Sequence, residues 1–93
     1  VAAFGSNCYG LFIDNENFLY CSMYHQHKVM KLSLKSSSSG FKLVAGTGIA
    51  GIAANQLSSP YGIYVDRHFN LYVADTGNQR IQLFARGQTH AVT

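Results

Sequence analysis

The stretches YGLFIDNENFLYCSMYHQHKVMKL (residues 9–32) and YGIYVDRHFNLYVADTGNQRIQLF (residues 61–84) align with each other without a gap. The second begins 52 positions after the first, and five pairs are identical: Tyr9/Tyr61, Gly10/Gly62, Asp14/Asp66, Leu19/Leu71 and Tyr20/Tyr72. Other positions carry close replacements, such as Val29 and Ile81. Self-similarity at a fixed spacing is the signature of a repeat architecture, so the chain consists of two copies of one unit.

Each copy has the hydrophobic pattern of three short strands. The first strand is almost continuously apolar, as expected of a strand buried on both faces, and the third alternates apolar and polar residues. A fourth strand follows the Ser-rich spacer of the first copy. The expected strands span residues 9–14, 18–23, 28–34 and 40–46 in the first copy, and residues 61–66, 70–75 and 80–86 in the second. We therefore predict an all-β fold with four antiparallel strands per repeat, at the spacing of β-propeller blades.

The two ends of the chain complete this pattern. HAVT (residues 90–93) resembles the start of a fourth strand, and VAAFG (residues 1–5) resembles its continuation. We expect residues 1–46 to form one blade and residues 47–93 a second, with an outer strand shared across the termini. Two blades cannot close a ring and leave hydrophobic faces unpaired. The expected partners are therefore flanking blades of a longer chain or further copies of this one, three copies giving six blades.

The second copy resembles an NHL repeat. The residues that carry the resemblance lie in SPYGIYVD and NLYVADTGNQRI: Pro60, Gly62, Asp66, Asn70, Leu71, Tyr72, Val73, Asp75, Asn78, Arg80 and Ile81. The resemblance implies a β-propeller, most often of six blades, whose faces bind proteins or other ligands. Some propellers similar in fold are peptide-amidating lyases or calcium-dependent hydrolases. We expect a non-catalytic binding or scaffold module, with part of a metal-dependent lyase or hydrolase as the alternative.

Several motif residues have expected structural roles. Asp14 and Asp66 end equivalent inner strands, where Asp commonly caps a turn. Asp75 is expected to accept hydrogen bonds from the backbone N–H groups of Gly77 or Asn78, and Arg80 to pair with Asp75. Gly62 is expected to allow close approach of the inner strand to its neighbours.

The turn between the second and third strands differs between the copies. In the first copy Met23, Tyr24 and His25 replace Asp75, Thr76 and Gly77, so we expect this turn to close differently. Together with the loop before residue 60, these turns form the rim expected to contact a partner. The predicted rim residues are Tyr24, His25, Gln26, His27, Gln56, Thr76, Asn78 and Gln79.

Catalytic and cofactor sites are not expected. The pair His25 and His27 alone does not make a metal site, and only four acidic residues are present. Gly46, Gly48 and Gly51 spell G-x-G-x-x-G, which together with Asp66 imitates a dinucleotide-binding fingerprint. The segment that follows is too short for the required helix, so no cofactor is predicted.

The cysteines leave two alternatives open. Simple hairpin register places Cys21 opposite Leu11, about three residues from Cys8, so the two cysteines form either a disulfide or two buried thiols. A disulfide favours an extracellular or secreted setting.

Composition limits the classes of partner. The chain of 93 residues is 47% hydrophobic and 12% charged, which indicates a folded domain. Its net charge of +3 rests on seven scattered Lys and Arg, which does not favour nucleic acid as a partner. No apolar run reaches the length of a membrane span. Composition therefore argues against a membrane or nucleic acid as the partner and leaves a protein or another ligand open.

Overall fold

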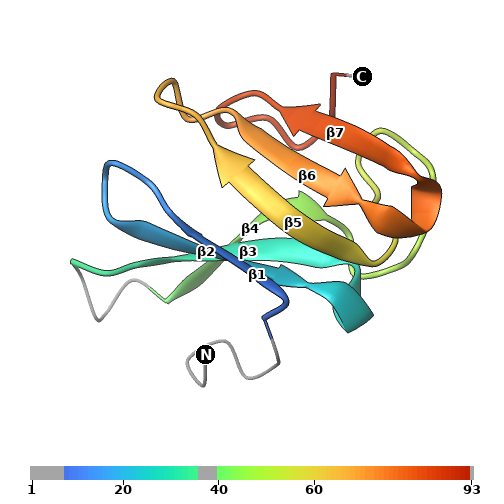
Figure 1. The fold of residues 1–93 in the computed structure, drawn as a ribbon, viewed down its shortest axis with the longest axis horizontal. Helices are drawn as coiled ribbons and strands as arrows, with labels where there is room; N and C mark the ends of the chain where they lie inside the picture. The colour runs from blue at the N-terminus through green and yellow to red at the C-terminus, as the bar shows by residue number, and fades with distance from the viewer. Residues whose placement is uncertain (1–7, 36–39, 93) are drawn as a thin grey trace.

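The chain folds into two antiparallel β-sheets that pack against each other (Figure 1). The computed structural model describes residues 8–35 and 40–92. The first sheet contains β1 (Gly10–Ile13), β2 (Phe18–Met23), β3 (Lys28–Ser33) and β4 (Phe41–Gly46) in that order. The second contains β5 (Pro60–Val65), β6 (Leu71–Asp75) and β7 (Arg80–Phe84). The predicted all-β class is confirmed, and the described residues contain no α-helix.

The strands lie where the hydrophobic pattern predicts them, and the register agrees with the simple hairpin. The first strands are not buried on both faces as predicted, because the other sheet covers only one face of each, and Leu11 and Ile13 remain 52% and 56% exposed. Cys21 lies opposite Leu11, as predicted, and β3 ends one residue before the predicted end of that strand. The predicted shared outer strand is only partly described. Residues 1–5 lie outside the described residues, and Val92 forms an isolated antiparallel bridge with Leu83.

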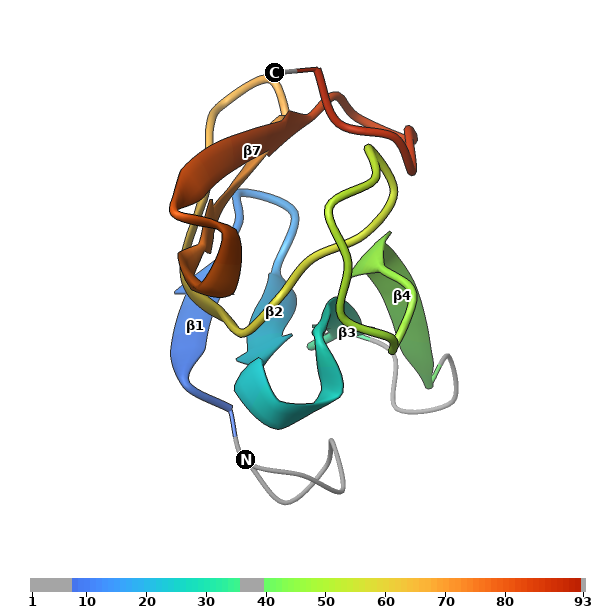
Figure 2. The ribbon, with the colours of Figure 1, turned by 90° about the vertical axis from the view of Figure 1, so that its right-hand side faces the viewer.

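One hydrophobic core lies between the two sheets. Turned by 90°, the ribbon shows the sheets side by side, with the loop of residues 47–59 passing between them (Figure 2). The buried core residues are Tyr20, Val29 and Ala45 from the first sheet, Leu57 from the loop, and Val65, Leu71, Val73 and Phe84 from the second. Fully burying one such side chain contributes about 1.5–3 kcal/mol, so this core is the main force that joins the two repeats.

The first strands of the two repeats meet at their closest approach around Gly10. The Ser22 hydroxyl accepts a hydrogen bond from the Gly10 N–H at 2.7 Å and donates one to the Tyr61 carbonyl of the second sheet. A Cβ atom on Gly10 would collide with that carbonyl. Gly62 was expected to make the close approach, but a Cβ there meets only the Ala74 side chain, at 3.9 Å. The tight contact therefore occurs at the equivalent glycine of the first repeat.

A disulfide joins Cys8 to Cys21, with a Cα–Cα distance of 5.2 Å. Of the two alternatives left open by the sequence, the structure contains the bridge. Cys21 is fully buried and packs with Met23 and the half-buried Leu19, Met30 and Leu32 on the side of the first sheet that faces away from the second. The bridge therefore covers part of an otherwise open apolar face.

Among the described residues, no helix is long and apolar enough to cross a membrane.

Candidate binding rim

One end of the two sheets collects three connecting segments (Figure 1). These are η2 (Tyr24–Gln26) between β2 and β3, η3 (Thr76–Asn78) between β6 and β7, and the loop of residues 47–59. The predicted rim residues all belong to these segments or directly follow them. The side chains nevertheless divide into a group that holds the loop in place and a group that remains open to a partner.

Asp75 is the centre of the first group. It is fully buried, and its Oδ1 accepts a hydrogen bond from the Ser58 N–H at 2.6 Å. Its Oδ2 accepts from Asn78 Nδ2 at 2.9 Å and from Arg80 Nε at 2.7 Å. The expected bonds to the backbone N–H groups of Gly77 and Asn78 are not the ones formed, because Gly77 N–H donates to the Ser58 carbonyl instead. Asp75 therefore ties the turn to the incoming loop rather than capping the turn itself.

Arg80 and Asn78 extend this support along the loop. Arg80 pairs with Asp75, as expected, and its guanidinium also donates to the carbonyls of Ile52, Ala53 and Gln56. Asn78 Nδ2 also donates to the Gly51 carbonyl at 2.8 Å. Each contact satisfies a loop carbonyl that has no strand partner. Arg80 and Asn78 thus hold the loop, and they are poorly placed to bind a separate molecule.

The corresponding turn of the first repeat has the same backbone shape but closes with different hydrogen bonds, as expected: Asp75 binds the loop in the second repeat, and the His27 ring does so in the first. His27 has φ 56° and Gln79 has φ 54°, so both turns end on a left-handed residue after a short 3-10 segment. His27 Nδ1 accepts a hydrogen bond from the Ser59 N–H at 3.0 Å. The backbone shape is therefore independent of the Asp and Gly at the second turn.

Four rings form the open part of the rim, which we call the aromatic cluster: Tyr9, Tyr24, His25 and Tyr61. Tyr9 stacks on Tyr24 with ring centroids 4.8 Å apart, and it meets His25 and Tyr61 edge-on at 5.5 and 5.7 Å. The Tyr9 hydroxyl and His25 Nε2 lie 2.9 Å apart. Such edge-on and stacked pairs contribute about 0.5–1.5 kcal/mol each, so the rings hold one another in fixed orientations.

The aromatic cluster remains accessible although its members contact one another. Tyr9, His25 and Tyr61 are exposed, and Tyr24 is half-buried. The sequence predicted Tyr24 and His25 but missed Tyr9 and Tyr61. An identical tyrosine at the first position of both repeats was the signal that pointed to them, because equivalent strands begin at the same end of the two sheets.

The other predicted rim residues lie at the same end without joining the cluster. Gln26, Thr76 and Gln79 are exposed, and the Gln56 Oε1 accepts a hydrogen bond from the Ala53 N–H at 3.3 Å within its own loop. These side chains enlarge the polar surface around the cluster.

Asp14 and Asp66 lie at the opposite end and have matching roles. Asp14 Oδ1 accepts from the N–H groups of Glu16 and Phe18, and Oδ2 accepts from the Tyr20 hydroxyl at 2.9 Å. Asp66 makes the equivalent bonds, including one from the Tyr72 hydroxyl at 3.4 Å.

In the pairs Asp14–Tyr20 and Asp66–Tyr72 the carboxylate and the tyrosine hydroxyl interact electrostatically. Hydrogen bonds, the largest from the Asn70 N–H, hold the pKa of Asp66 below its usual range. Burial and the neighbouring carboxylate raise the pKa of Tyr20 and, similarly, that of Tyr72. These groups therefore stabilise the turns between the first and second strands of each repeat.

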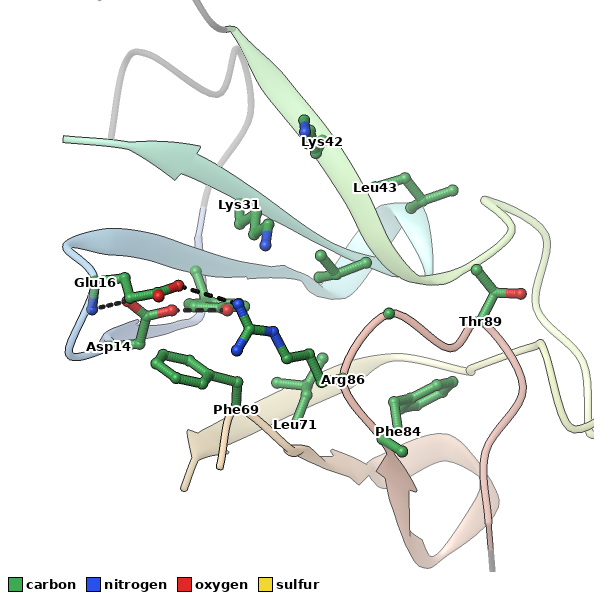
Figure 3. Close-up of a pocket in the computed structure, with 14 residues that line it drawn as sticks. Asp14, Glu16, Lys31, Lys42, Leu43, Phe69, Leu71, Phe84, Arg86 and Thr89 are labelled. Atoms are coloured by element: carbon green, nitrogen blue, oxygen red, sulfur yellow. Dashed lines mark hydrogen bonds and ion pairs between the residues drawn. The ribbon is translucent and has the colours of Figure 1, made fainter. Parts of the chain in front are cut away.

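A pocket of about 240 Å³ lies between the sheets at this opposite end. Figure 3 shows Arg86 extending from the turn after β7 toward Glu16, with the two side chains 3.5 Å apart at their charged atoms. Phe69 lies beneath the Arg86 guanidinium, which is 4.5 Å from the ring centroid. Lys31 and Lys42 line the far wall. Because its carboxylates already bind tyrosine, backbone or Arg86, the polar groups that this pocket offers to a ligand are chiefly the Lys31 and Lys42 side chains.

The donor groups of the described residues do not converge on a metal ion. No group of three or more His, Cys, Asp or Glu comes together within residues 8–35 and 40–92. His25 and His27 turn to different neighbours, Tyr9 and Ser59.

Comparison of the sequence with protein-family models and with curated proteins gives no match.

Proposed function

We propose that the chain is a non-catalytic binding module built on two NHL-like β-propeller blades, and that it binds a protein or peptide through the aromatic cluster. The observation that carries the proposal is the set of four accessible rings, Tyr9, Tyr24, His25 and Tyr61, which contact one another at one end of the sheets.

The physical argument rests on the cost of ordering a binding surface. Tyrosine is enriched among the residues that dominate protein–protein binding energy. Rings that already stack on one another lose little rotational freedom when a partner arrives, so less of the interaction energy is spent on ordering them. The cluster also combines apolar ring faces with hydroxyl and imidazole groups, which suits a peptide backbone.

The repeat supports the scaffold part of the proposal. Two sheets with equivalent turns, equivalent Asp–Tyr pairs and one shared core are the arrangement expected of neighbouring blades. The disulfide fits an extracellular or secreted setting, because such bonds persist in oxidising compartments.

A metal-dependent lyase or hydrolase remains the alternative. It requires His25 and His27 to turn toward one ion, and each now has one ring nitrogen in contact with a different group. Isothermal titration of the chain with Zn²⁺ tests it. Binding that disappears in both His25→Ala and His27→Ala would favour the enzyme over the binding module.

The binding proposal is tested with displayed random peptides selected on the immobilised chain. The Kd of an enriched peptide is then measured for the wild type, Tyr24→Ala, Tyr61→Ala and the control Leu34→Ala. Leu34 is an exposed apolar residue just beyond β3, at the other end of the first sheet. We expect about a tenfold or greater loss in both tyrosine variants, as for a central aromatic contact. Equal affinity in all four proteins, or an equal loss in the control, contradicts the proposal.

A further inference from the structure

Residues that are equivalent in the two repeats contact each other where the first strands meet. Tyr9 lies edge-on to Tyr61 at 5.7 Å, and Phe12 lies edge-on to its own equivalent, Tyr64, at 5.2 Å. Equivalent positions contact each other when a rotation about a nearby axis carries one unit onto the next. Applying the same rotation to the second sheet would place a further sheet against its far face.

The first sheet uses one defined face for its contact with the second. Strand pairing places Phe12 opposite Tyr20 and Ser22 opposite Val29, so these side chains share a face. Tyr20 and Val29 belong to the common core, and Ser22 bonds to the Tyr61 carbonyl.

The equivalent face of the second sheet has little such cover, although the Tyr64 ring meets Phe12 at its edge. Adding 52 to the positions of this face gives Gly62, Tyr64, Tyr72, Ala74 and Ile81. Pairing of Tyr64 with Tyr72, and of Ala74 with Ile81, places them on the side that points away from the first sheet. Tyr64 is 55% exposed and Ile81 is 61% exposed. Residues that are covered in the first repeat are thus open in the second.

The far side of the first sheet is equivalent to the side of the second sheet that faces the core. In the second sheet the core-facing residues are Ile63, Val65, Leu71, Val73 and Phe84. Their equivalents in the first repeat are Leu11, Ile13, Leu19, Cys21 and Leu32, which share the face turned away from the second sheet. Leu11 and Ile13 remain 52% and 56% exposed. This face therefore has the residue types that cover a neighbouring sheet inside the chain, but it meets no sheet, and among the described residues the Cys8–Cys21 bridge covers only its part around Cys21.

We propose that these two open faces bind each other between copies of the chain, head to tail. The far face of the second sheet of one copy packs on the far face of the first sheet of the next, and so reproduces the contact already present within each chain. The residues named on both faces carry no charge, and the register adds one charged residue, Lys28, at the end of the first-sheet face beside Met23.

The glycines support the direction of this contact. Gly10 leaves no room for a Cβ because the next sheet presses against it, whereas Gly62 has open space on the corresponding side. A second copy would use the space at Gly62 in the same way. One difference is that Ala74 replaces Ser22, so the contact between chains lacks the hydroxyl bridge and is more apolar than the internal one.

A head-to-tail contact joins two different surfaces, so copies add until a ring closes, or form an open filament if the rotation does not close. With two sheets per chain, three copies give a ring of six, the number that the NHL resemblance implies. The aromatic cluster is complete within one chain, so this association and the binding of a peptide are tested separately.

The test measures the mass of the 93-residue chain in solution by light scattering. We expect the wild type to have the mass of three 10.2 kDa chains. Ile81→Asp blocks one face and Leu11→Asp blocks the other, so each variant alone is expected at the mass of one chain. Mixed in equal amounts, the two variants still share one intact pair of faces, so they form a heterodimer and stop there. Ile52→Asp, a change at an exposed loop residue outside both faces, is the control and keeps the wild-type mass.

The mixing experiment separates head-to-tail contact from other modes. A symmetric contact through Ile81 alone would leave Leu11→Asp associated, and this result overturns the proposal. So do a wild type at the mass of one chain and a mixture in which both folded variants stay single. Far-UV circular dichroism and an intact Cys8–Cys21 bridge show that each variant has kept its fold.

Discussion

The two turns between the second and third strands of each repeat have the same backbone shape but different supports. Each continues from an extended residue, Met23 or Asp75, into a 3-10 segment and ends on a left-handed residue. Around Asp75 a buried carboxylate, an arginine and an asparagine hold the loop of residues 47–59. Around Met23 the support is apolar, with the Cys8–Cys21 bridge packed beside it.

The difference shows that the pairing of the flanking strands determines the backbone shape of the turn, whereas the side chains determine which other segment the turn contacts. The second turn holds the loop of residues 47–59, and Arg80, paired with the buried Asp75, donates hydrogen bonds to three loop carbonyls. The first turn lies beside an open sheet face and uses a covalent bond and apolar contacts instead. The two repeats should therefore respond differently to changes in charge and in redox state.

The largest effect is expected for Asp75→Ala. The change removes a buried acceptor from Arg80, Asn78 and the Ser58 N–H together. Breaking a buried ion pair from one side typically costs about 3–5 kcal/mol. We expect the lower end of that range, about 3 kcal/mol, because Arg80 keeps its bonds to loop carbonyls. Urea unfolding measures the loss, and Thr76→Ala in the same turn is a control with little change. A loss no larger than in the control would show that the loop does not depend on the network.

The second effect concerns the disulfide. Its cysteines are separated by 13 positions, and loops of this size are stabilised by about 2–3 kcal/mol. We expect that loss in the free energy of unfolding when Cys8 and Cys21 are both changed to Ala. Because the bridge and the Asp75 network have no residue in common, the losses should add when the changes are combined. A combined loss well below the sum would mean that the two supports act through one element.

The third effect compares Gly10 with Gly62. Gly10→Ala places a methyl group against the Tyr61 carbonyl, and overpacking of this kind costs about 1–3 kcal/mol. Gly62→Ala meets open space, and at such a site the unfolding free energy changes by no more than about 0.5 kcal/mol. Urea unfolding of both variants at a concentration where the chain is monomeric compares them. An equal loss at both positions would contradict the different surroundings of the two glycines.

The fold was predictable because the repeat and the strand periodicity agree. Positions such as Leu19 and Leu71 repeat at one spacing, and alternation identified their strands. The contacts of Asp75 were not predictable, because Ser58 is 17 positions away and the loop that brings it back has no periodic pattern. The aromatic cluster was half predicted. Tyr24 and His25 belong to a recognisable turn, whereas Tyr9 and Tyr61 reach it only through the packing of the two sheets.

The smallest effect concerns the equivalent pairs Tyr20–Asp14 and Tyr72–Asp66. An unfolded tyrosine ionises near pH 10, and the pKa of Tyr20 is raised in the fold, chiefly by burial. The Tyr20 hydroxyl therefore contributes stability that is complete below about pH 10 and is lost as the pH rises from there through the folded pKa.

Tyr20→Phe should lower the unfolding free energy at pH 7 by about 1 kcal/mol and should flatten its alkaline decline. Tyr72→Phe should change both the free energy and its alkaline decline less, because Tyr72 is only half-buried and its hydroxyl lies 3.4 Å from its carboxylate, against 2.9 Å for Tyr20. Urea unfolding from pH 7 to pH 11 measures both variants. If the unfolding free energies of both variants fell equally with pH, the Tyr20–Asp14 pair would stabilise the fold no more than the Tyr72–Asp66 pair. The greater burial of Tyr20 would then not strengthen its bond to the carboxylate.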